Sequence, residues 1–199
     1  MATGSTPLKR RALAPDILSA INISGITLIA LMLGLILMQA AMNQSRSLTR
    51  AGVTANIPSG WILRQGVAQE ELIYSASDPT SPYLKYSVSL VPAVPGGTVM
   101  DSVPPVNLNR GRALNAYKVL AQTPAVARGK DTFKVDFAYV QTNDSTSLPV
   151  VVRGVDYYFA EGDQVLLITL EEESGLFNAA LPGFLRFVES VRYAPGGVK

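Results

Sequence analysis

The residues best suited to chemistry in this sequence are carboxylates, and the densest group of them is Glu171-Glu172-Glu173. Hard cations such as Ca²⁺ bind carboxylate oxygens, so this group could hold a metal ion. It ends an apolar stretch with strand-like composition, and adjacent residues of a strand point to opposite faces of a sheet. The three side chains therefore cannot all converge on one ion, and a solvated strand end is the simpler interpretation.

A second group of carboxylates is scattered along the chain, and any two of them could act as general acid and base if the fold brought them together. A Ser–His–Asp arrangement is excluded because the sequence has no histidine, and no local signature marks a Ser–Lys pair. The scattered carboxylates are Asp78, Asp101, Asp131, Asp136, Asp144, Asp156 and Asp163. We therefore expect no enzyme, and an anchored hydrolase is the least favoured function.

Histidine and cysteine are both absent from the 199 residues. Their absence excludes disulfides, thiolate-held iron–sulfur clusters, haem ligation by these residues and zinc sites built from the usual ligands. We expect no cofactor and no metal. The net charge is +2 and charged residues make up 16% of the chain, so no strong field favours nucleic acid as a partner.

Three further features could bind a ligand. Arg110, Arg112 and Lys118 form a small basic patch, most simply a solvated helix face. Residues 92–105 form a long Pro-rich loop, which is either a binding loop or a tolerated surface insertion. Tyrosines at strand spacing could line a groove, although such residues more often form a core with hydroxyls at its rim. The tyrosines are Tyr74, Tyr83, Tyr86, Tyr139, Tyr157 and Tyr158.

The element that positions everything else is the uncharged apolar stretch at residues 17–42. Its length of about 26 residues exceeds the ~20 that a helix needs to cross a hydrocarbon core, so it predicts one membrane-spanning helix. A cleaved signal peptide is the alternative, because a basic flank and Gln39-Ala40-Ala41 fit its pattern. The apolar stretch is much longer than the ~7–15 residues of a signal peptide, which favours a retained anchor.

The basic residues around this stretch predict its orientation. Lys9, Arg10 and Arg11 precede it, whereas Arg46 and Arg50 follow it. The positive-inside rule places the N-terminus in the cytoplasm and the following domain outside the inner (cytoplasmic) membrane. The expected organisation is a cytoplasmic tail (1–16), a transmembrane helix (17–42), a linker (43–55), an extracytoplasmic domain (56–193) and a C-terminal tail (194–199).

Small and polar side chains within the span favour contact with other transmembrane helices. Small residues let helices approach closely, and an amide or hydroxyl in lipid favours an interhelical hydrogen bond. The competing interpretation is that such residues are common in any span and that hydroxyls bond to their own backbone. The residues expected to contact a partner helix are Ala20, Asn22, Ser24, Thr27 and Gly34.

The remainder of the chain predicts an α+β domain. Alternating apolar residues indicate strands over 71–76, 83–91 and 132–141, and a tight turn at Glu161-Gly162-Asp163 joins strands over 150–160 and 164–171. The last of these strands is apolar on both faces and is expected to be central. Helices are expected over 107–122 and over 174–193, where Pro182-Gly183 should cause a kink or break. Hairpin-linked strands with two helices give an antiparallel sheet flanked by helices.

This order of elements, together with short motifs at its two ends, resembles the PsbP-like (Mog1/PsbP) family. The motif residues are Pro58, Gly60 and Trp61 at the start of the domain and Phe184, Phe187, Ser190 and Arg192 at its end. The resemblance implies an α/β/α sandwich and a non-enzymatic extrinsic subunit, or assembly factor, of a photosynthetic membrane complex. The sequence departs from the familiar members in its membrane span and in its lack of histidine, so no His-containing site carries over. A weaker resemblance, in organisation alone, is to cofactor-free subunits of bacterial complexes such as alternative complex III.

These observations lead to one expected function and one rival. The expected function is a single-pass, non-catalytic accessory subunit that stabilises or assembles a larger membrane complex, one of photosynthetic or respiratory electron transfer. Its expected partners are the lipid bilayer and the transmembrane helices and extracytoplasmic surfaces of that complex. The rival is a membrane-anchored module that binds a ligand or protein at the loop 92–105, which a deep apolar pocket beside that loop would favour.

Overall fold

The computed structural model describes residues 15–42, 44–66, 71–142 and 148–195, although for residues 15–23 and 38–42 it describes the backbone alone. The chain divides into two compact units, Met1–Gln44 and Ser45–Lys199. Most of the expected cytoplasmic tail, the carboxylate Asp144 and the end of the C-terminal tail lie outside the described residues.

The first unit contains helix α1, which runs from Pro15 to Met42 and confirms the helix expected over residues 17–42. The side chains described in α1 are those of residues 24–37, and all of them are exposed. Within what the structure describes, no helix is both long enough and apolar enough to cross a membrane. The membrane-spanning role of this helix therefore stays a prediction.

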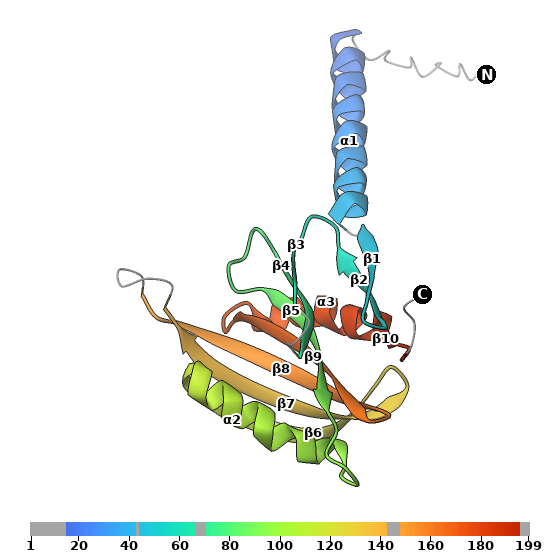
Figure 1. The fold of residues 1–199 in the computed structure, drawn as a ribbon. Helices are drawn as coiled ribbons and strands as arrows, with labels where there is room; N and C mark the ends of the chain where they lie inside the picture. Colours follow the sequence, from blue (N-terminus) through green and yellow to red (C-terminus); the bar gives the residue numbers. More distant parts are fainter. Residues whose placement is uncertain (1–14, 43, 67–70, 143–147, 196–199) are drawn as a thin grey trace, which may run out of the picture. The chain divides into compact units, whose positions relative to one another are not determined.

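The second unit is built on a seven-stranded antiparallel sheet with the strand order β3-β4-β5-β9-β8-β7-β6 (Figure 1). The strands expected over 71–76, 83–91, 132–141, 150–160 and 164–171 are all present, with ends shifted by a few residues. The strands are β3 (Ile62–Gln65), β4 (Leu72–Ser77), β5 (Lys85–Pro92), β6 (Asn115–Ala127), β7 (Lys130–Gln141), β8 (Val150–Glu161) and β9 (Gln164–Glu173). At the β8–β9 turn Gly162 has a φ of 72°, which glycine adopts without strain.

Strand β9 is central, as its apolar faces predict, and it contributes to a core on each side of the sheet. Leu166, Ile168 and Leu170 pack with helix α3 (Phe177–Ser190) on one face. Val165 and Leu167 pack on the other face with helix α2 (Val103–Ala113) and the short 3-10 helix η1 (Val99–Ser102). The second unit is therefore an α+β domain with a helix on each face of an antiparallel sheet, as expected (Figure 1).

The expected linker over residues 43–55 is wrong. Strands β1 (Ser45–Arg50) and β2 (Val53–Pro58) form a hairpin that, with β10 (Arg192–Tyr193), makes a separate three-stranded sheet. Every other residue of β2 is buried, because Val53, Ala55 and Ile57 belong to the core beneath α3. β1 is polar and mostly exposed, so its sequence has the composition of a flexible linker.

The helix expected over residues 107–122 is confirmed for residues 107–113 and wrong beyond them. Helix α2 ends at Ala113, and residues 115–127 form the edge strand β6, which pairs with β7. Helix α2 starts inside the expected loop 92–105, because Pro104 and Pro105 occupy its first turn, where a missing N–H removes no helical hydrogen bond. The extended backbone of Leu114 then ends the helix. Pairing with the long strand β7 outweighs the helical pattern of apolar residues beyond this point.

Helix α3 confirms the expected closing helix with tighter ends, and it continues through Pro182 without a break. The two motifs of the PsbP-like resemblance meet here. Trp61 contacts the Tyr86 ring at 4.6 Å between centroids, and Tyr86 in turn lies 5.3 Å from Phe184 and 5.0 Å from Phe187. The Asn56 N–H also donates to the Ser190 hydroxyl at 3.0 Å. The motif residues therefore hold the two ends of the domain together.

The tyrosines expected to form a core or a groove lie mainly in the core. Their burial makes the stability of the domain fall at high pH. Burial raises the pKa of Tyr86 to about 12 and also raises that of Tyr74. Their stabilisation is complete below the unfolded-state pKa of ~10 and is lost as pH rises through the folded-state pKa. We expect the free energy of unfolding to fall above pH ~10 by about 1.4 kcal/mol per pH unit for each such tyrosine, measured by denaturant titration at several pH values. Unchanged stability up to pH ~12 would contradict the burial of these hydroxyls.

Candidate functional site

A buried ion pair fixes helix α2 onto the sheet. Asp156 on β8 is fully buried, and Arg110 on α2 forms a salt bridge with it while its own side chain is 17% exposed. Burial alone would lower the pKa of the Arg110 guanidinium, but the Asp156 carboxylate more than offsets this and raises it. Arg110 therefore stays charged and cannot act as a base. The basic patch expected from Arg110, Arg112 and Lys118 is wrong, because Arg110 points inward and Lys118 lies on β6.

The carboxylate of Asp156 has further donors, so its charge is well satisfied. The Thr169 hydroxyl donates to it at 2.7 Å and the Tyr158 hydroxyl at 3.4 Å. The second terminal nitrogen of Arg110 donates to Asp156 at 3.1 Å and to Thr169 at 3.3 Å. A carboxylate with this many donors is held in place as an acceptor, which suits a structural role rather than proton transfer.

Gly154 makes room for the aromatic ring that supports this ion pair. The Arg110 guanidinium lies 4.4 Å from the centre of the Phe137 ring. A Cβ atom at Gly154 would lie 2.1 Å from the Cζ atom of Phe137, so any larger residue would displace the ring. Glycine at this position in β8 therefore serves packing rather than a turn.

The glutamates at the end of β9 do not converge, as the alternation of a strand predicts. Glu171 forms a salt bridge of 2.6 Å with Lys85 and accepts a hydrogen bond of 3.1 Å from the Tyr139 hydroxyl. Glu172 is buried and accepts a hydrogen bond from Ser81 at 3.2 Å. Among the described residues, no three His, Cys, Asp or Glu side chains form a group that could hold a metal ion.

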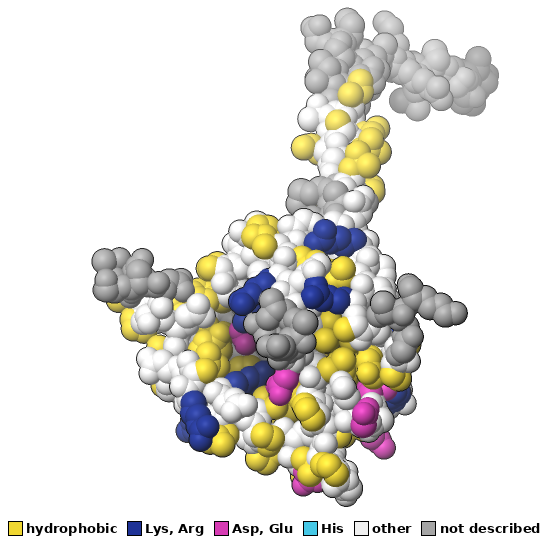
Figure 2. All heavy atoms as spheres, in the orientation of Figure 1, with side chains coloured by type: hydrophobic (Ala, Val, Ile, Leu, Met, Phe, Trp, Pro, Cys, Tyr) yellow, Lys and Arg dark blue, Asp and Glu magenta, His cyan; other side chains and the backbone are white. Residues whose placement is uncertain are grey.

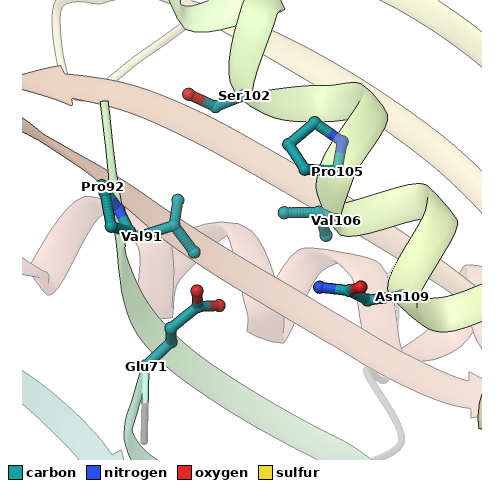
Figure 3. Close-up of a pocket in the computed structure, with 7 residues that line it drawn as sticks. All are labelled: Glu71, Val91, Pro92, Ser102, Pro105, Val106 and Asn109. Atoms are coloured by element: carbon teal, nitrogen blue, oxygen red, sulfur yellow. The ribbon is translucent and has the colours of Figure 1, made fainter. Parts of the chain in front are cut away.

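A cavity of about 220 Å³ lies between strand β5 and helix α2, beside the segment 92–105 (Figure 3). Its wall is apolar where Val91, Pro92, Pro105 and Val106 line it. Three polar side chains complete the lining, namely Glu71, Ser102 and Asn109. Figure 3 shows the Glu71 carboxylate and the Asn109 amide extending from opposite sides toward the space between β5 and α2.

Ser102 is the one lining residue with an unexplained polar group. Its side chain is 2% exposed, and its hydroxyl has no hydrogen-bond partner among the described residues. A buried hydroxyl without a partner costs about 1–3 kcal/mol, so such groups usually mark a binding or strained position. With no base bonded to this hydroxyl, the cavity offers binding groups rather than an activated nucleophile.

The structure describes the side chains of only some of the residues expected to contact a partner helix. Ser24, Thr27 and Gly34 lie in the section of α1 with described side chains and are exposed, whereas Ala20 and Asn22 lie where only the backbone is described. Sequence reasoning singled out the segment 92–105 as a possible binding loop, and the cavity lies beside it. It missed Glu71 and Asn109, because residues 38 positions apart have no spacing signal that relates them.

The charged side chains on the face shown in Figure 2 do not form one field. Lys and Arg side chains are interspersed with Asp and Glu, with apolar and neutral surface between them. A large surface of one sign is what a nucleic-acid-binding protein would need, and this face does not provide it.

No protein-family model matches the sequence, and no curated protein matches it. Among solved structures, cyanobacterial PsbP (CyanoP) from Synechocystis is similar with a TM-score of 0.56 at 12% identity, covering 76% of this chain and 92% of that chain. The Ran-binding protein Mog1p from Saccharomyces cerevisiae matches with a TM-score of 0.45 at 11% identity, covering 75% and 95%. At such low identity the likeness to CyanoP establishes the fold alone. The domain after α1 has a PsbP-like fold.

Proposed function

We propose that this protein is a non-catalytic accessory subunit that α1 anchors in the inner membrane, and that it stabilises or assembles a larger membrane complex. The observation that carries the proposal is the exposure of the large apolar side chains described in α1, each of which is 54–69% exposed in the isolated chain. They are Ile26, Leu28, Ile29, Leu31, Met32, Leu33, Leu35, Ile36 and Leu37.

Such a helix needs an apolar environment. An exposed apolar surface of this extent is unfavourable in water, whereas each Leu or Ile at the centre of a spanning helix contributes about −0.3 to −0.6 kcal/mol to insertion. A bilayer would satisfy the whole surface at once. The N-terminal tail would lie in the cytoplasm and the PsbP-like domain outside it, according to the basic residues that flank the helix.

Part of the α1 surface would contact helices of the complex rather than lipid. Ala20, Asn22, Ser24, Thr27 and Gly34 are the residues proposed for this contact, because small side chains permit close packing and polar ones can form interhelical hydrogen bonds. At Gly34 a Cβ atom would meet nothing within 4 Å, so a larger residue fits the free chain and would clash only with a partner.

The domain would act by binding, without making or breaking bonds. The sequence has no His or Cys, and the buried charges Arg110 and Asp156 are committed to each other. Burial of an interface favours the assembled state by mass action. The PsbP-like fold supports a complex of photosynthetic or respiratory electron transfer.

Purification of the tagged full-length chain in mild detergent tests this function. We expect integral membrane proteins to co-purify and to be identified by mass spectrometry, and we expect Gly34→Leu to lower their yield several-fold. Leu33→Phe is the matched control, because it also adds bulk but lies outside the proposed contact residues. Recovery of the unaltered chain alone would contradict the proposal.

The second candidate function, a membrane-anchored binding module, is favoured by one specific observation. The cavity beside residues 92–105 has mainly apolar walls with a few polar groups, which is the pattern of binding pockets. The two functions are compatible if the cavity is where the domain contacts a protein partner.

A further inference from the structure

We propose that the cavity between β5 and α2 binds a lysine or arginine side chain of a partner protein. The inference deepens the proposed accessory function, because it names a contact through which the domain would hold its partner. It depends on the size of the cavity, its apolar wall and, within the described residues, the unpaired carboxylate of Glu71 in its lining.

The size of the cavity favours a single side chain over a small-molecule ligand. Its volume of about 220 Å³ lies below the ~300–1,000 Å³ typical of pockets for drug-sized ligands. Interface anchors are commonly single large residues that fill a pocket of this kind, and arginine is enriched among them. The cavity is therefore large enough for one long side chain and too small for most cofactors.

The charge of the cavity favours a cation. Glu71 is exposed at the rim, and among the described residues no cation forms an ion pair or hydrogen bond with its carboxylate. The nearest basic residue along α2 is Arg110, whose charge is already paired with Asp156. An anionic side chain would meet Glu71 with no compensating positive group in the lining, so repulsion excludes it.

The apolar wall favours a cation on a long aliphatic stem. Val91 belongs to the buried core and Val106 packs against it, while Pro92 and Pro105 add further apolar lining to the cavity. Lys and Arg side chains bury their methylene stems against such surfaces and keep the charged end at a polar rim. The side-chain carbonyl oxygen of Asn109 can accept a hydrogen bond from the ammonium or guanidinium group.

The test is a titration of the full-length chain in neutral detergent, followed by the ¹H–¹⁵N NMR signals of Ser102, Val106 and Asn109. The probes are Nα-acetyl-arginine amide, Nα-acetyl-lysine amide and Nα-acetyl-norleucine amide, the last of which has an aliphatic side chain without charge. We expect saturable shifts with both cationic probes and an affinity about 2- to 5-fold lower with norleucine, as the loss of one exposed ion pair predicts. Methylammonium, a cation without a stem, should shift none of the three signals.

Glu71→Gln keeps the shape of the side chain and removes its charge, so it should lower the affinity for the cationic probes by about 2- to 5-fold and leave norleucine binding unchanged. Asp131→Asn is the matched control, since it removes the same charge from an exposed carboxylate outside the lining and should change nothing. Equal binding of all three probes, or the absence of saturable shifts, would overturn the inference. Either result is independent of whether membrane proteins co-purify with the chain, so failure of this site and failure of the accessory function can be told apart.

Discussion

Replacing Asp156 with alanine should destabilise the domain by about 3–5 kcal/mol, because it leaves the charge of Arg110 buried without a partner. The Thr169 and Tyr158 hydroxyls would lose their acceptor at the same time. Total stabilities of single domains are about 5–15 kcal/mol, so this one change removes a large part of the margin. Denaturant unfolding of the full-length chain in detergent, followed by the fluorescence of its single tryptophan, Trp61, measures the loss.

Two variants separate the ion pair from a general effect of charge removal. Asp131→Asn removes an exposed carboxylate and should change the free energy of unfolding by no more than about 0.5 kcal/mol. The double variant Asp156→Leu with Arg110→Met should recover most of the loss, because replacing a buried pair with apolar residues is often neutral. An Asp156→Ala variant as stable as the unaltered protein would show that α2 is not held through this pair.

Replacing Leu31 with arginine should abolish stable membrane association. Leu31 lies near the middle of α1 and is 67% exposed, so a charge there would face the hydrocarbon core. On the insertion scale arginine at the helix centre costs about 2.5–3.5 kcal/mol, and the favourable contribution of leucine is lost as well. The combined change of about 3–4 kcal/mol lowers the membrane-to-water equilibrium by a factor of several hundred. The fraction of chain that sediments with membranes after cell fractionation measures it.

Leu31→Phe is the control for this substitution, because phenylalanine is similarly favourable in lipid and larger than leucine. It should sediment with membranes as the unaltered chain does. Retention of the arginine variant at the unaltered level would mean that contacts of the PsbP-like domain, and not α1, hold the protein at the membrane.

The elements with strong periodicity could be predicted from the sequence, and those that depend on tertiary pairing could not. Strand β7 and helix α3 have clear periodicities and β9 follows a tight hairpin turn, so the predicted positions of all three are correct within a few residues. The sequence predicts a helix over residues 115–122 of β6, because the apolar residues there also suit a helical stripe and only pairing with β7 decides between the two. β1 is polar and mostly exposed, so nothing within it indicates a strand.

In the candidate site, too, some features could be predicted from the sequence and others could not. Residues 92–105 could be singled out because a long Pro-rich segment is conspicuous in a sequence. The Arg110–Asp156 pair could not be predicted, because its residues are 46 positions apart and the sequence pattern places Arg110 on a solvated helix face. The cavity combines Glu71 before β4 with Ser102 and Asn109 near and on α2, and only the antiparallel sheet brings these segments together.

The central claim of the proposed function is that α1 is embedded in a bilayer and anchors the PsbP-like domain to it. Extraction of isolated membranes with alkaline carbonate tests it most directly, because the treatment releases peripheral proteins and leaves helices embedded in lipid. The full-length chain should remain in the membrane pellet. Its release into the supernatant as an intact or shortened polypeptide would contradict the claim.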